Sequence, residues 1–379
     1  MSLYGSRTSP RNWFLTKRES LLRRGFKPSD IDPCLFINEK LQLLCCVYCD
    51  DCLIFAPNRA TLDNFILELK KEFDLTAEDS IEDYLGVRVS FNKQHNTVTL
   101  SQTGLIDKIL STVFPDAGEY VKPHYTPAVD PPLGRDDDGS ESTVEWSYRS
   151  IIGSLLYLAN NTRPDIMFAV HQAARFSSNP KQSHHLAVAR ICRYLHATKD
   201  KGLIFVPKQN DLQCFVDADF AGLWKTKEFE HPSSCLSRSG FVILYAGAPI
   251  LWVSKLQTEI ALSTTEAEYI ALSHSMRDLI PTKNLLHELA VFFNIPAPDI
   301  VTSCTVFEDN ASAQQLALCP KLRPRTKHIG IKYHFFRNHV QNGSIQIKFV
   351  PSELQLADIF TKALPRSTFE QHRKALMGW

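Results

Sequence analysis

The chain has 379 residues, enough for two or three domains, and 44% of them are hydrophobic, which is typical of globular protein. Its 42 basic and 41 acidic residues give a formal net charge of +1, without the domain-wide basic excess that marks many nucleic-acid-binding proteins. The sequence shows no signal peptide and no apolar run of the roughly 20 residues that cross a bilayer, so we expect no membrane partner.

The first segment, up to about residue 122, alternates helical and extended patterns. A helix is expected from Arg11 to Arg24, and a Gly-Phe-Lys-Pro break follows it. Apolar residues run from Leu41 to Ala56, interrupted only around two aspartates, and this run predicts a hairpin. Apolar residues at helical spacing predict a second helix over Thr61–Phe73. Two short strands are expected to complete the segment: Gly86–Phe91 and Thr97–Ser101.

The middle of the chain changes in composition. Residues 123–145 are expected to be a linker, because they combine prolines, glycines and serines with the acidic run Asp136–Asp138. From Trp146 to about Lys199 apolar residues recur at helical spacing, which predicts a helical region.

From about Gly202 strand and helix patterns alternate, which favours an α/β domain. A strand over Leu212–Val216 ends at Asp217, and a strand over Cys304–Phe307 leads to Asp309. Both acids therefore stand where α/β folds tend to place functional groups. The other expected elements are a hairpin, two helices and a last strand: Phe241–Tyr245 with Ile250–Ser254, Thr264–Leu279, Lys283–Phe293 and Ile345–Val350.

Asp50 and Asp51 stand at the centre of the predicted hairpin. Burying two like charges costs roughly several kcal/mol each unless something neutralises them, and hard carboxylate oxygens suit Mg²⁺. The pair is therefore either a divalent-cation site or an exposed turn, and the residues alone leave both open. Cys49 and Cys52 flank the pair without a second pair at zinc spacing, and the carboxylates are expected to raise the pKa of these thiols. The ten cysteines stand mostly in apolar stretches, which is typical of free thiols.

Tyr48-Cys49-Asp50-Asp51 resembles the Tyr-x-Asp-Asp signature of reverse transcriptases. Further stretches resemble the Ty1/copia class of retrotransposons, so that the resemblance covers nearly the whole chain: Leu3-Tyr4-Gly5, Ser9-Pro10-Arg11, Asp32-Pro33-Cys34-Leu35-Phe36, Tyr84-Leu85-Gly86, Tyr148–Ala159 and Thr162-Arg163-Pro164-Asp165-Ile166. The resemblance implies a polymerase palm, in which Asp50 and Asp51 are catalytic and bind metal, followed by a thumb. These polymerases also use a third aspartate and a fingers subdomain, and Met1 falls after both. The resemblance therefore implies that polymerase activity is lost by truncation.

Four stretches of the last segment resemble the ribonuclease H of copia-type elements, and each contains an acid at the position of a catalytic carboxylate. They are Phe215-Val216-Asp217-Ala218-Asp219, Ser263–Leu272, Phe307-Glu308-Asp309-Asn310 and Leu356-Ala357-Asp358-Ile359. The resemblance implies that Asp217, Glu268, Asp309 and Asp358 are catalytic and bind two Mg²⁺ ions, with Mn²⁺ as an alternative and Asp217 as the bridge. Four carboxylates from separate elements can hold two cations, and without them they repel one another.

Two choices within this set rest on different arguments. Glu266 and Glu268 both fit a capping box, so capping leaves the choice open, and the family position favours Glu268. Alternation along the strand puts Asp217 at its end, on the face of Phe215, and the family position agrees. Asp219 is expected at the rim.

Three further features have no assigned role. The N-terminal run Arg7–Lys27 and the run Lys321–Lys327 are basic and are either nucleic-acid contacts or solvated surface. Arg325-Thr326-Lys327-His328-Ile329 resembles a family segment between the third and fourth carboxylates. His328 is either a residue that assists product release or phosphate contact, or a surface histidine beside a basic loop. The loop Leu223–Leu236 is longer than the family usually has.

The expected fold class is α/β and α+β. Its expected parts are a partial reverse transcriptase palm over 1–122, a linker and helical thumb or connection over 123–200, a ribonuclease H-like mixed sheet with helices over 201–366, and a tail over 367–379. The expected function is hydrolysis of RNA in RNA–DNA hybrids; the alternatives are a non-catalytic nucleic-acid-binding module and an inert relic of a decayed element. Expected partners are the hybrid and other polyprotein products, with no small-molecule substrate in the ribonuclease H domain. The absence of targeting signals fits the cytosol and the nucleus equally.

Overall fold

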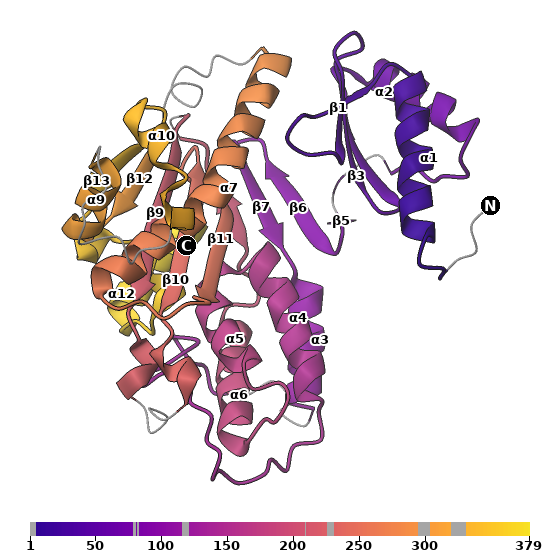
Figure 1. Cartoon of the computed structure of the whole chain (residues 1–379). Coiled ribbons are helices and arrows are strands. Elements are labelled where there is room, and N and C mark those ends of the chain that lie inside the picture. The colour runs from indigo at the N-terminus through magenta and orange to yellow at the C-terminus, as the bar shows by residue number, and fades with distance from the viewer. Residues whose placement is uncertain are drawn as a thin grey trace. The chain divides into compact units, whose positions relative to one another are not determined.

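The computed structural model describes residues 5–78, 81, 83–115, 121–208, 210–225, 231–294, 304–319 and 331–379. The chain divides into two units (Figure 1): unit 1 combines Met1–Asp79 with Ile280–Val301, and unit 2 combines Ser80–Leu279 with Thr302–Trp379. Both mix helices with sheets, so the expected α/β and α+β class is confirmed. No helix within the described ranges is both long and apolar enough to cross a membrane.

Unit 1 contains a four-stranded antiparallel sheet in the order β1-β2-β3-β4, which follows the chain: Lys27–Pro28, Leu35–Asn38, Leu43–Tyr48 and Asp51–Phe55. Helices α1 (Ser9–Arg23) and α2 (Arg59–Lys70) pack their apolar residues into one core with Phe36 of β2. The side chain of Asn58 accepts a hydrogen bond from the Thr61 N–H at 2.9 Å and so fixes the start of α2. The helices and the hairpin predicted here are confirmed.

One helix takes the place of the two predicted after residue 264, because α7 runs from Thr264 to Phe292 with Pro281 inside it. Proline removes one helical hydrogen bond and crowds the preceding turn, which is why a break was expected. The loss of this hydrogen bond affects only one turn, and packing holds the apolar residues on both sides of Pro281 in the helix. Leu272 and Leu279 are buried in the first half, while Phe292 packs against β2 and β3 of unit 1 in the second half. The prediction of two separate helices is therefore wrong.

Unit 2 is organised around a five-stranded sheet in the order β11-β10-β9-β12-β13. Its first three strands are antiparallel, and β12 and β13 join in parallel: β9 (Leu212–Asp219), β10 (Arg238–Tyr245), β11 (Ala248–Leu256), β12 (Thr305–Glu308) and β13 (Gln346–Phe349). The central strand β9 is buried on both faces, as expected for a strand covered by helices on each side. The strands predicted for this segment are confirmed.

A second, antiparallel sheet of unit 2 has the order β5-β6-β7-β8: Asp83–Tyr84, Val87–Asn92, Thr97–Ser101 and Leu203–Phe205. Four helices form the predicted helical region and the segment before it: α3 (Thr103–Val113), α4 (Tyr148–Asn161), α5 (Met167–Ala174) and α6 (Gln182–Ala197). Further helices among the described residues are α9 (Ala311–Leu318), α10 (Arg337–Gln341), α11 (Asp358–Thr361) and α12 (Arg366–Met377). Short 3-10 turns lie at η1 (Pro164–Ile166), η2 (Gly222–Lys225), η3 (Pro232–Cys235), η5 (Ile331–His334) and η6 (Ser352–Leu354).

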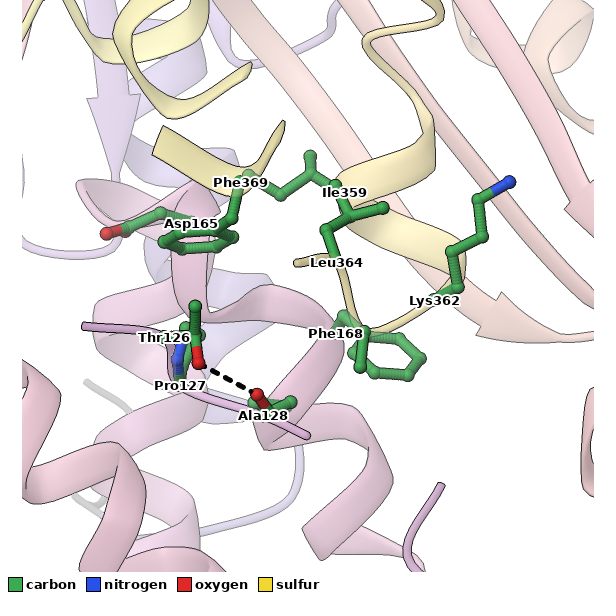
Figure 2. A pocket seen from close by; sticks show the side chains of 11 residues that line it. Thr126, Pro127, Ala128, Asp165, Phe168, Ile359, Lys362, Leu364 and Phe369 are labelled. Carbon is green, nitrogen blue, oxygen red and sulfur yellow. Dashed lines mark hydrogen bonds between the residues drawn. The ribbon is translucent and has the colours of Figure 1, made fainter. Parts of the chain in front are cut away.

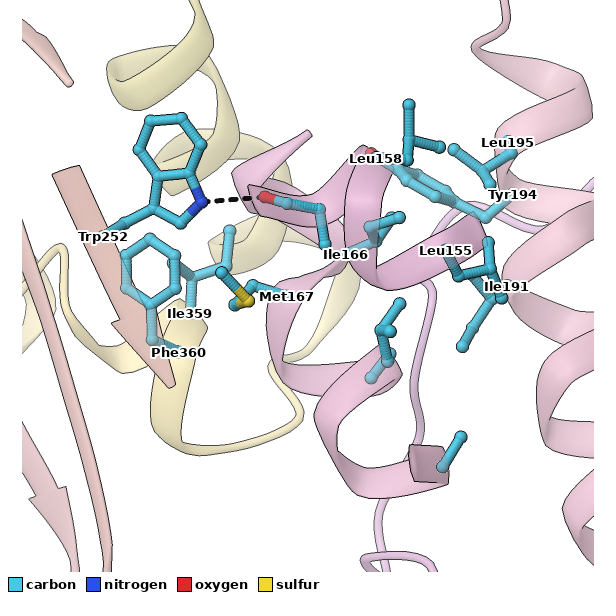
Figure 3. Packing of buried hydrophobic residues seen from close by; sticks show 14 of the residues in the cluster. Leu155, Leu158, Ile166, Met167, Ile191, Tyr194, Leu195, Trp252, Ile359 and Phe360 are labelled. Atoms are coloured by element: carbon cyan, nitrogen blue, oxygen red, sulfur yellow. Dashed lines mark hydrogen bonds between the residues drawn. The ribbon is translucent and has the colours of Figure 1, made fainter. Parts of the chain in front are cut away.

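One hydrophobic core joins the five-stranded sheet to helices α4–α6 (Figure 3). Leu155 of α4 and Ile191 of α6 are buried within it. Trp252 of β11 donates its indole N–H to the carbonyl of Ala159 at 2.8 Å, so its ring is buried with its polar atom satisfied. The helical region and the sheet therefore share one core within unit 2.

A fully buried ion pair lies among the helices of unit 2. The side chains of Arg163 and Asp165 are both 0% exposed, and the guanidinium contacts the carboxylate at 2.9 and 2.8 Å. The Tyr194 hydroxyl donates to the same carboxylate at 2.5 Å, and Arg163 donates to the Thr198 hydroxyl at 2.7 Å. The guanidinium also lies over the ring of the C-terminal Trp379. Because both charges have bonded partners, their burial is tolerated.

Candidate functional site

The register of β9 and β12 brings two of the predicted acids to one end of the sheet. Phe307 pairs with Phe215 in the parallel ladder, and their rings stack with centroids 4.6 Å apart. Because residues two apart share a face of a strand, Asp217 and Asp309 follow these rings on the same side. Asp217 is 3% exposed, whereas Asp309 is half-buried and accepts a hydrogen bond from the Ser352 hydroxyl at 2.8 Å.

Helix α7 contributes a third acid to this place. Carboxylate oxygens of Asp217, Glu268 and Asp309 lie within 4.8 Å of one another. Glu266 instead accepts a hydrogen bond from the Leu262 N–H at 2.8 Å, next to the first turn of the helix. The structure therefore brings Glu268 to the aspartates and gives Glu266 a capping position.

Asp358 stands on α11, which packs against β10 at Gly240. A Cβ atom on Gly240 would lie 2.7 Å from Cγ2 of Thr361 and 2.8 Å from Cβ of Phe360, so a side chain here would push the helix away. Gly240 also pairs with Asp217 across the β10–β9 ladder. The Thr361 hydroxyl donates a hydrogen bond to Oδ2 of Asp217. This close approach thus brings α11, which carries Asp358, next to the part of the sheet that carries Asp217.

Burial and repulsion by neighbouring acids raise the pKa values of Asp217, Glu268 and Asp358. The pKa of Asp217 is raised to about 7, mainly by burial and further by the charge of Asp358. Burial, followed by the charges of Glu308 and Asp217, raises the pKa of Glu268 well above its usual range. Lys362 acts in the opposite direction, because its Nζ lies 2.9 Å from Oδ1 of Asp358 and 3.9 Å from Oδ2 of Asp217. Such strongly perturbed, clustered groups are typical of functional sites.

Glu308 and Lys362 are site residues that the sequence reasoning missed. Glu308 is 0% exposed, and burial together with the charges of Asp309 and Asp217 raises its pKa well above the usual range. Its signal was visible as two adjacent acids at the end of a predicted strand. The signal for Lys362 was its spacing of four residues after Asp358, which is a common ion-pair spacing on helices.

The donor set fits a hard divalent cation. All three converging groups are carboxylates, the ligands that Mg²⁺ and Mn²⁺ prefer. Within the part of the chain that the structure describes, Oε2 of Glu268 is buried without a hydrogen-bond partner, which costs free energy unless a ligand satisfies it. A bound cation would also offset the repulsion among the carboxylates.

In unit 1 the structure places Asp50 and Asp51 at the exposed turn of the β3–β4 hairpin. Lys17 of α1 donates to the carbonyls of Cys49 and Asp50 at 2.8 Å each and so holds the turn. The burial cost that suggested a cation site does not arise here, and the exposed-turn alternative describes the geometry. No third Asp, Glu, His or Cys among the described residues joins them at metal-binding spacing. Their catalytic and metal-binding role stays a prediction.

The net pKa shift of the Cys52 thiol is downward, although the carboxylate of Asp51 raises it as predicted. Its pKa is lowered to about 7, mainly by a hydrogen bond with the Cys45 thiol and then by the charge of Lys17, whose Nζ lies 3.8 Å from its Sγ. Asp51 acts in the predicted direction but is outweighed. The lysine is distant in sequence, so the local pattern could not reveal it. None of the ten cysteines forms a disulfide, as predicted.

Some predicted features lie outside the described residues. They are Leu3-Tyr4, the basic run Lys321–Lys327 with His328, and residues 226–230 of the loop Leu223–Leu236.

Comparison with known proteins places the chain in a family. Residues 1–127 match the family described as reverse transcriptase (RNA-dependent DNA polymerase). The retrovirus-related Pol polyprotein from transposon RE1 of Arabidopsis thaliana is 33% identical over 374 residues, which cover 97% of this chain and 24% of that protein. The polyprotein from transposon TNT 1-94 of Nicotiana tabacum is 30% identical over 380 residues, covering 97% of this chain and 27% of that protein. The chain thus spans about a quarter of the length of these curated relatives.

A solved structure of the foamy viral protease-reverse transcriptase in complex with an RNA/DNA hybrid is similar to 92% of this chain and 39% of that one, at 12% identity and a TM-score of 0.43. The polyprotein matches extend over both units, whereas the reverse transcriptase match covers the first third of the chain. The chain belongs to the Ty1/copia-type retrotransposon polyproteins and corresponds to part of one.

Proposed function

We propose that unit 2 is a ribonuclease H that hydrolyses the RNA strand of RNA–DNA hybrids with two Mg²⁺ ions, or with Mn²⁺. The observation that carries the proposal is the convergence of three carboxylates from β9, α7 and the end of β12 within 4.8 Å. The chain order of Asp217, Glu268, Asp309 and Asp358 supports it, because four ribonuclease H-like stretches occur in that order.

Asp217, Glu268 and Asp309 would hold the cations, with Asp358 beside them. Bound Mg²⁺ supplies water activation and neutralisation of charge that develops on the leaving 3′-oxygen. The protein's own contribution is orientation: the Thr361 hydroxyl bonds Asp217, and the Ser352 hydroxyl bonds Asp309. These bonds hold the carboxylates in one geometry before substrate arrives, which lowers the reorganisation that the reaction needs.

Recognition of the hybrid would rest on phosphate and 2′-hydroxyl contacts rather than on base edges. Cleavage is therefore expected to show little sequence preference and to require ribose on the cleaved strand. Asp50 and Asp51 belong to unit 1, and we expect hydrolysis by this site to proceed without them.

The test is cleavage of an end-labelled RNA–DNA hybrid by the full chain with Mg²⁺. Wild type is expected to cut the RNA strand, and Glu268→Gln is expected to lose roughly 10³-fold or more of the rate, because it removes a ligand charge. Glu266→Gln is the matched control: it makes the same chemical change two residues away, keeps an acceptor for the Leu262 N–H, and is expected to cut at the wild-type rate.

Well-folded wild type that leaves the hybrid intact in both Mg²⁺ and Mn²⁺ would overturn the proposal. That outcome would favour a nucleic-acid-binding module, to be measured by retention of the labelled hybrid, or an inert relic that binds nothing. Equal losses in Glu266→Gln and Glu268→Gln would instead show that the substitutions act through the helix and not through the site.

A further inference from the structure

The four predicted carboxylates do not form one equivalent set. Asp217, Glu268 and Asp309 converge within 4.8 Å, and Asp358 lies outside that group. Asp358 is instead bound by the Lys362 ammonium, with 2.9 Å between Nζ and Oδ1. A second contact of 3.9 Å joins the same ammonium to Oδ2 of Asp217. A cation of the protein itself, the Lys362 ammonium, therefore contacts both the fourth acid and the first.

Lys362 is placed by a backbone hydrogen bond and by the ion pairs of its ammonium. Its backbone N–H donates to the carbonyl of Asp358 at 3.2 Å, just after the single turn of α11. Lys362 lines a small pocket together with Phe168 and Leu364 (Figure 2). Figure 2 shows the ammonium pointing away from these apolar residues. The backbone of Lys362 is thus held at the end of α11, and its charge is directed to the carboxylates.

The exposure of the partners shows how strongly the charges are coupled. The side chains of Asp217 and Asp358 are 4% and 9% exposed, whereas that of Lys362 is 44% exposed. Ion pairs with buried members are screened little by salt, so this contact is stronger than an ordinary surface ion pair. The lysine also has an open side toward solvent, so its ammonium can leave without unfolding α11.

An ammonium and a divalent cation compete for the same carboxylate oxygens, and they repel one another at short distance. We propose that Lys362 is a built-in competitor that divides the site into two unequal cation positions. The position formed by Asp217, Glu268 and Asp309 is open to a divalent cation, whereas the one next to Asp358 opens only when the Lys362 ammonium moves out. The inference rests on the proposed function and adds that this lysine sets the affinity of the weaker position.

The test is a titration of the full chain with Mn²⁺ alone at pH 8, followed by calorimetry and by the electron paramagnetic resonance signal of free Mn²⁺. Wild type is expected to bind one ion tightly and a second weakly. Lys362→Met is expected to tighten the second event by roughly tenfold to a hundredfold, the equivalent of one charged hydrogen bond, and to change the first less. Lys362→Gln provides a second variant in case the methionine protein does not fold.

Two controls separate the competitor role from general electrostatics. Lys362→Arg keeps the charge and is expected to bind as wild type does. Lys374→Met removes an exposed lysine of the nearby helix α12 and is expected to leave both events unchanged.

The outcomes also separate this inference from the proposed function. If wild type binds Mn²⁺ and the Lys362 variants give superimposable isotherms, the competitor role is overturned while the cation site stands. If folded wild type and Lys362→Met both fail to bind Mn²⁺, the cation site and the competitor role are overturned together.

Discussion

Unit 2 buries two aspartates in opposite ways. Asp165 lies among the helices, where Arg163 holds it with two hydrogen bonds and Tyr194 adds a third. Asp217 lies at the end of β9, where its neighbours are other carboxylates and its nearest ammonium is 3.9 Å away. Both side chains are almost inaccessible to water, with exposures of 0% and 4%.

The difference separates an acid whose buried charge is compensated from one whose buried charge is not. A buried charge whose partners are complete contributes to a single folded arrangement. A buried charge surrounded by like charges costs free energy in the empty protein, and natural sequences keep such a cost mainly where function requires it. Burial alone therefore does not identify a site; the lack of sufficient counter-charge does.

The largest expected effect comes from breaking the compensated pair. Arg163→Met leaves the Asp165 carboxylate buried without its cation and is expected to lower the free energy of unfolding by about 3–5 kcal/mol. Urea unfolding followed by circular dichroism measures this. Removing both charges together, as Arg163→Met with Asp165→Asn, is expected to cost less than the single change, because no charge stays unpaired. A single variant within about 1 kcal/mol of wild type would contradict the comparison.

The opposite sign is expected at the uncompensated acid. Asp217→Asn removes a charge from the carboxylate cluster, so without divalent cations it is expected to stabilise the protein at pH 8 by about 2–4 kcal/mol. Thermal unfolding in the presence of a chelator checks this. The same variant is expected to lose hybrid cleavage by roughly 10³-fold or more. Destabilisation by this variant in chelator would show that Asp217 is compensated after all.

The pH dependence sharpens the same point. In the cation-free protein the pKa of Asp217 is about 7, above its ordinary value of 3.8, so the folded state holds more protons than the unfolded state between these values. The stability from this group is therefore present near pH 4 and lost as the pH rises to about 7. Asp217→Asn is expected to flatten that slope, and stability curves for both proteins over this range in chelator measure it.

An intermediate effect is expected where α11 meets the sheet. Gly240→Ala puts a Cβ atom 2.7 Å from Thr361, so α11 must move outward, at a cost of about 1–3 kcal/mol in unfolding free energy and with weaker Mn²⁺ binding. Gly153→Ala is the matched control, because it stands on an exposed face of α4 with no atom within 4 Å of its Cβ. The control is expected to stabilise by about 0.5–1 kcal/mol, as alanine favours helix. Equal behaviour of the two variants would show that the close approach does not matter.

The smallest effect is expected in unit 1. Asp50→Asn with Asp51→Asn changes two exposed acids at a turn, so unfolding free energy is expected to stay within about 0.5 kcal/mol of wild type. Hybrid cleavage is expected to stay within about twofold, because the proposed site is in unit 2. A large loss of cleavage in this double variant would assign the exposed pair to the hydrolytic reaction.

Much of this arrangement was predictable from sequence, since it depends on local periodicity. The strands leading to Asp217 and Asp309 follow from apolar runs, and the hairpin of β3 and β4 follows from the run over Leu41–Ala56. What local patterns could not show depends on contacts between distant segments. The exposure of Asp50 and Asp51 and the low pKa of Cys52 depend on how α1 and the hairpin pack.

The site shows the same limit. A capping motif fits both Glu266 and Glu268, and the position of α7 against the end of β9 decides which one reaches the aspartates. Lys362 stands 145 residues after Asp217, and only the packing of α11 at Gly240 reveals that it opposes the first acid. Helix α7 was missed as one element because proline is a good predictor of helix ends and a poor one when packing on both sides is strong.

That uninterrupted helix has a practical consequence for protein production. A shortened protein that begins at residue 201 would keep α7 whole but lose the strands against which Leu285, Leu289 and Phe292 pack. It would also lose Ala159, the partner of Trp252, and Arg163, the partner of Trp379. Exposed apolar surface of this kind promotes aggregation. A shortened protein that contains the five-stranded sheet should therefore keep residues 83–200 attached. It should also replace Leu285, Leu289 and Phe292 with polar residues.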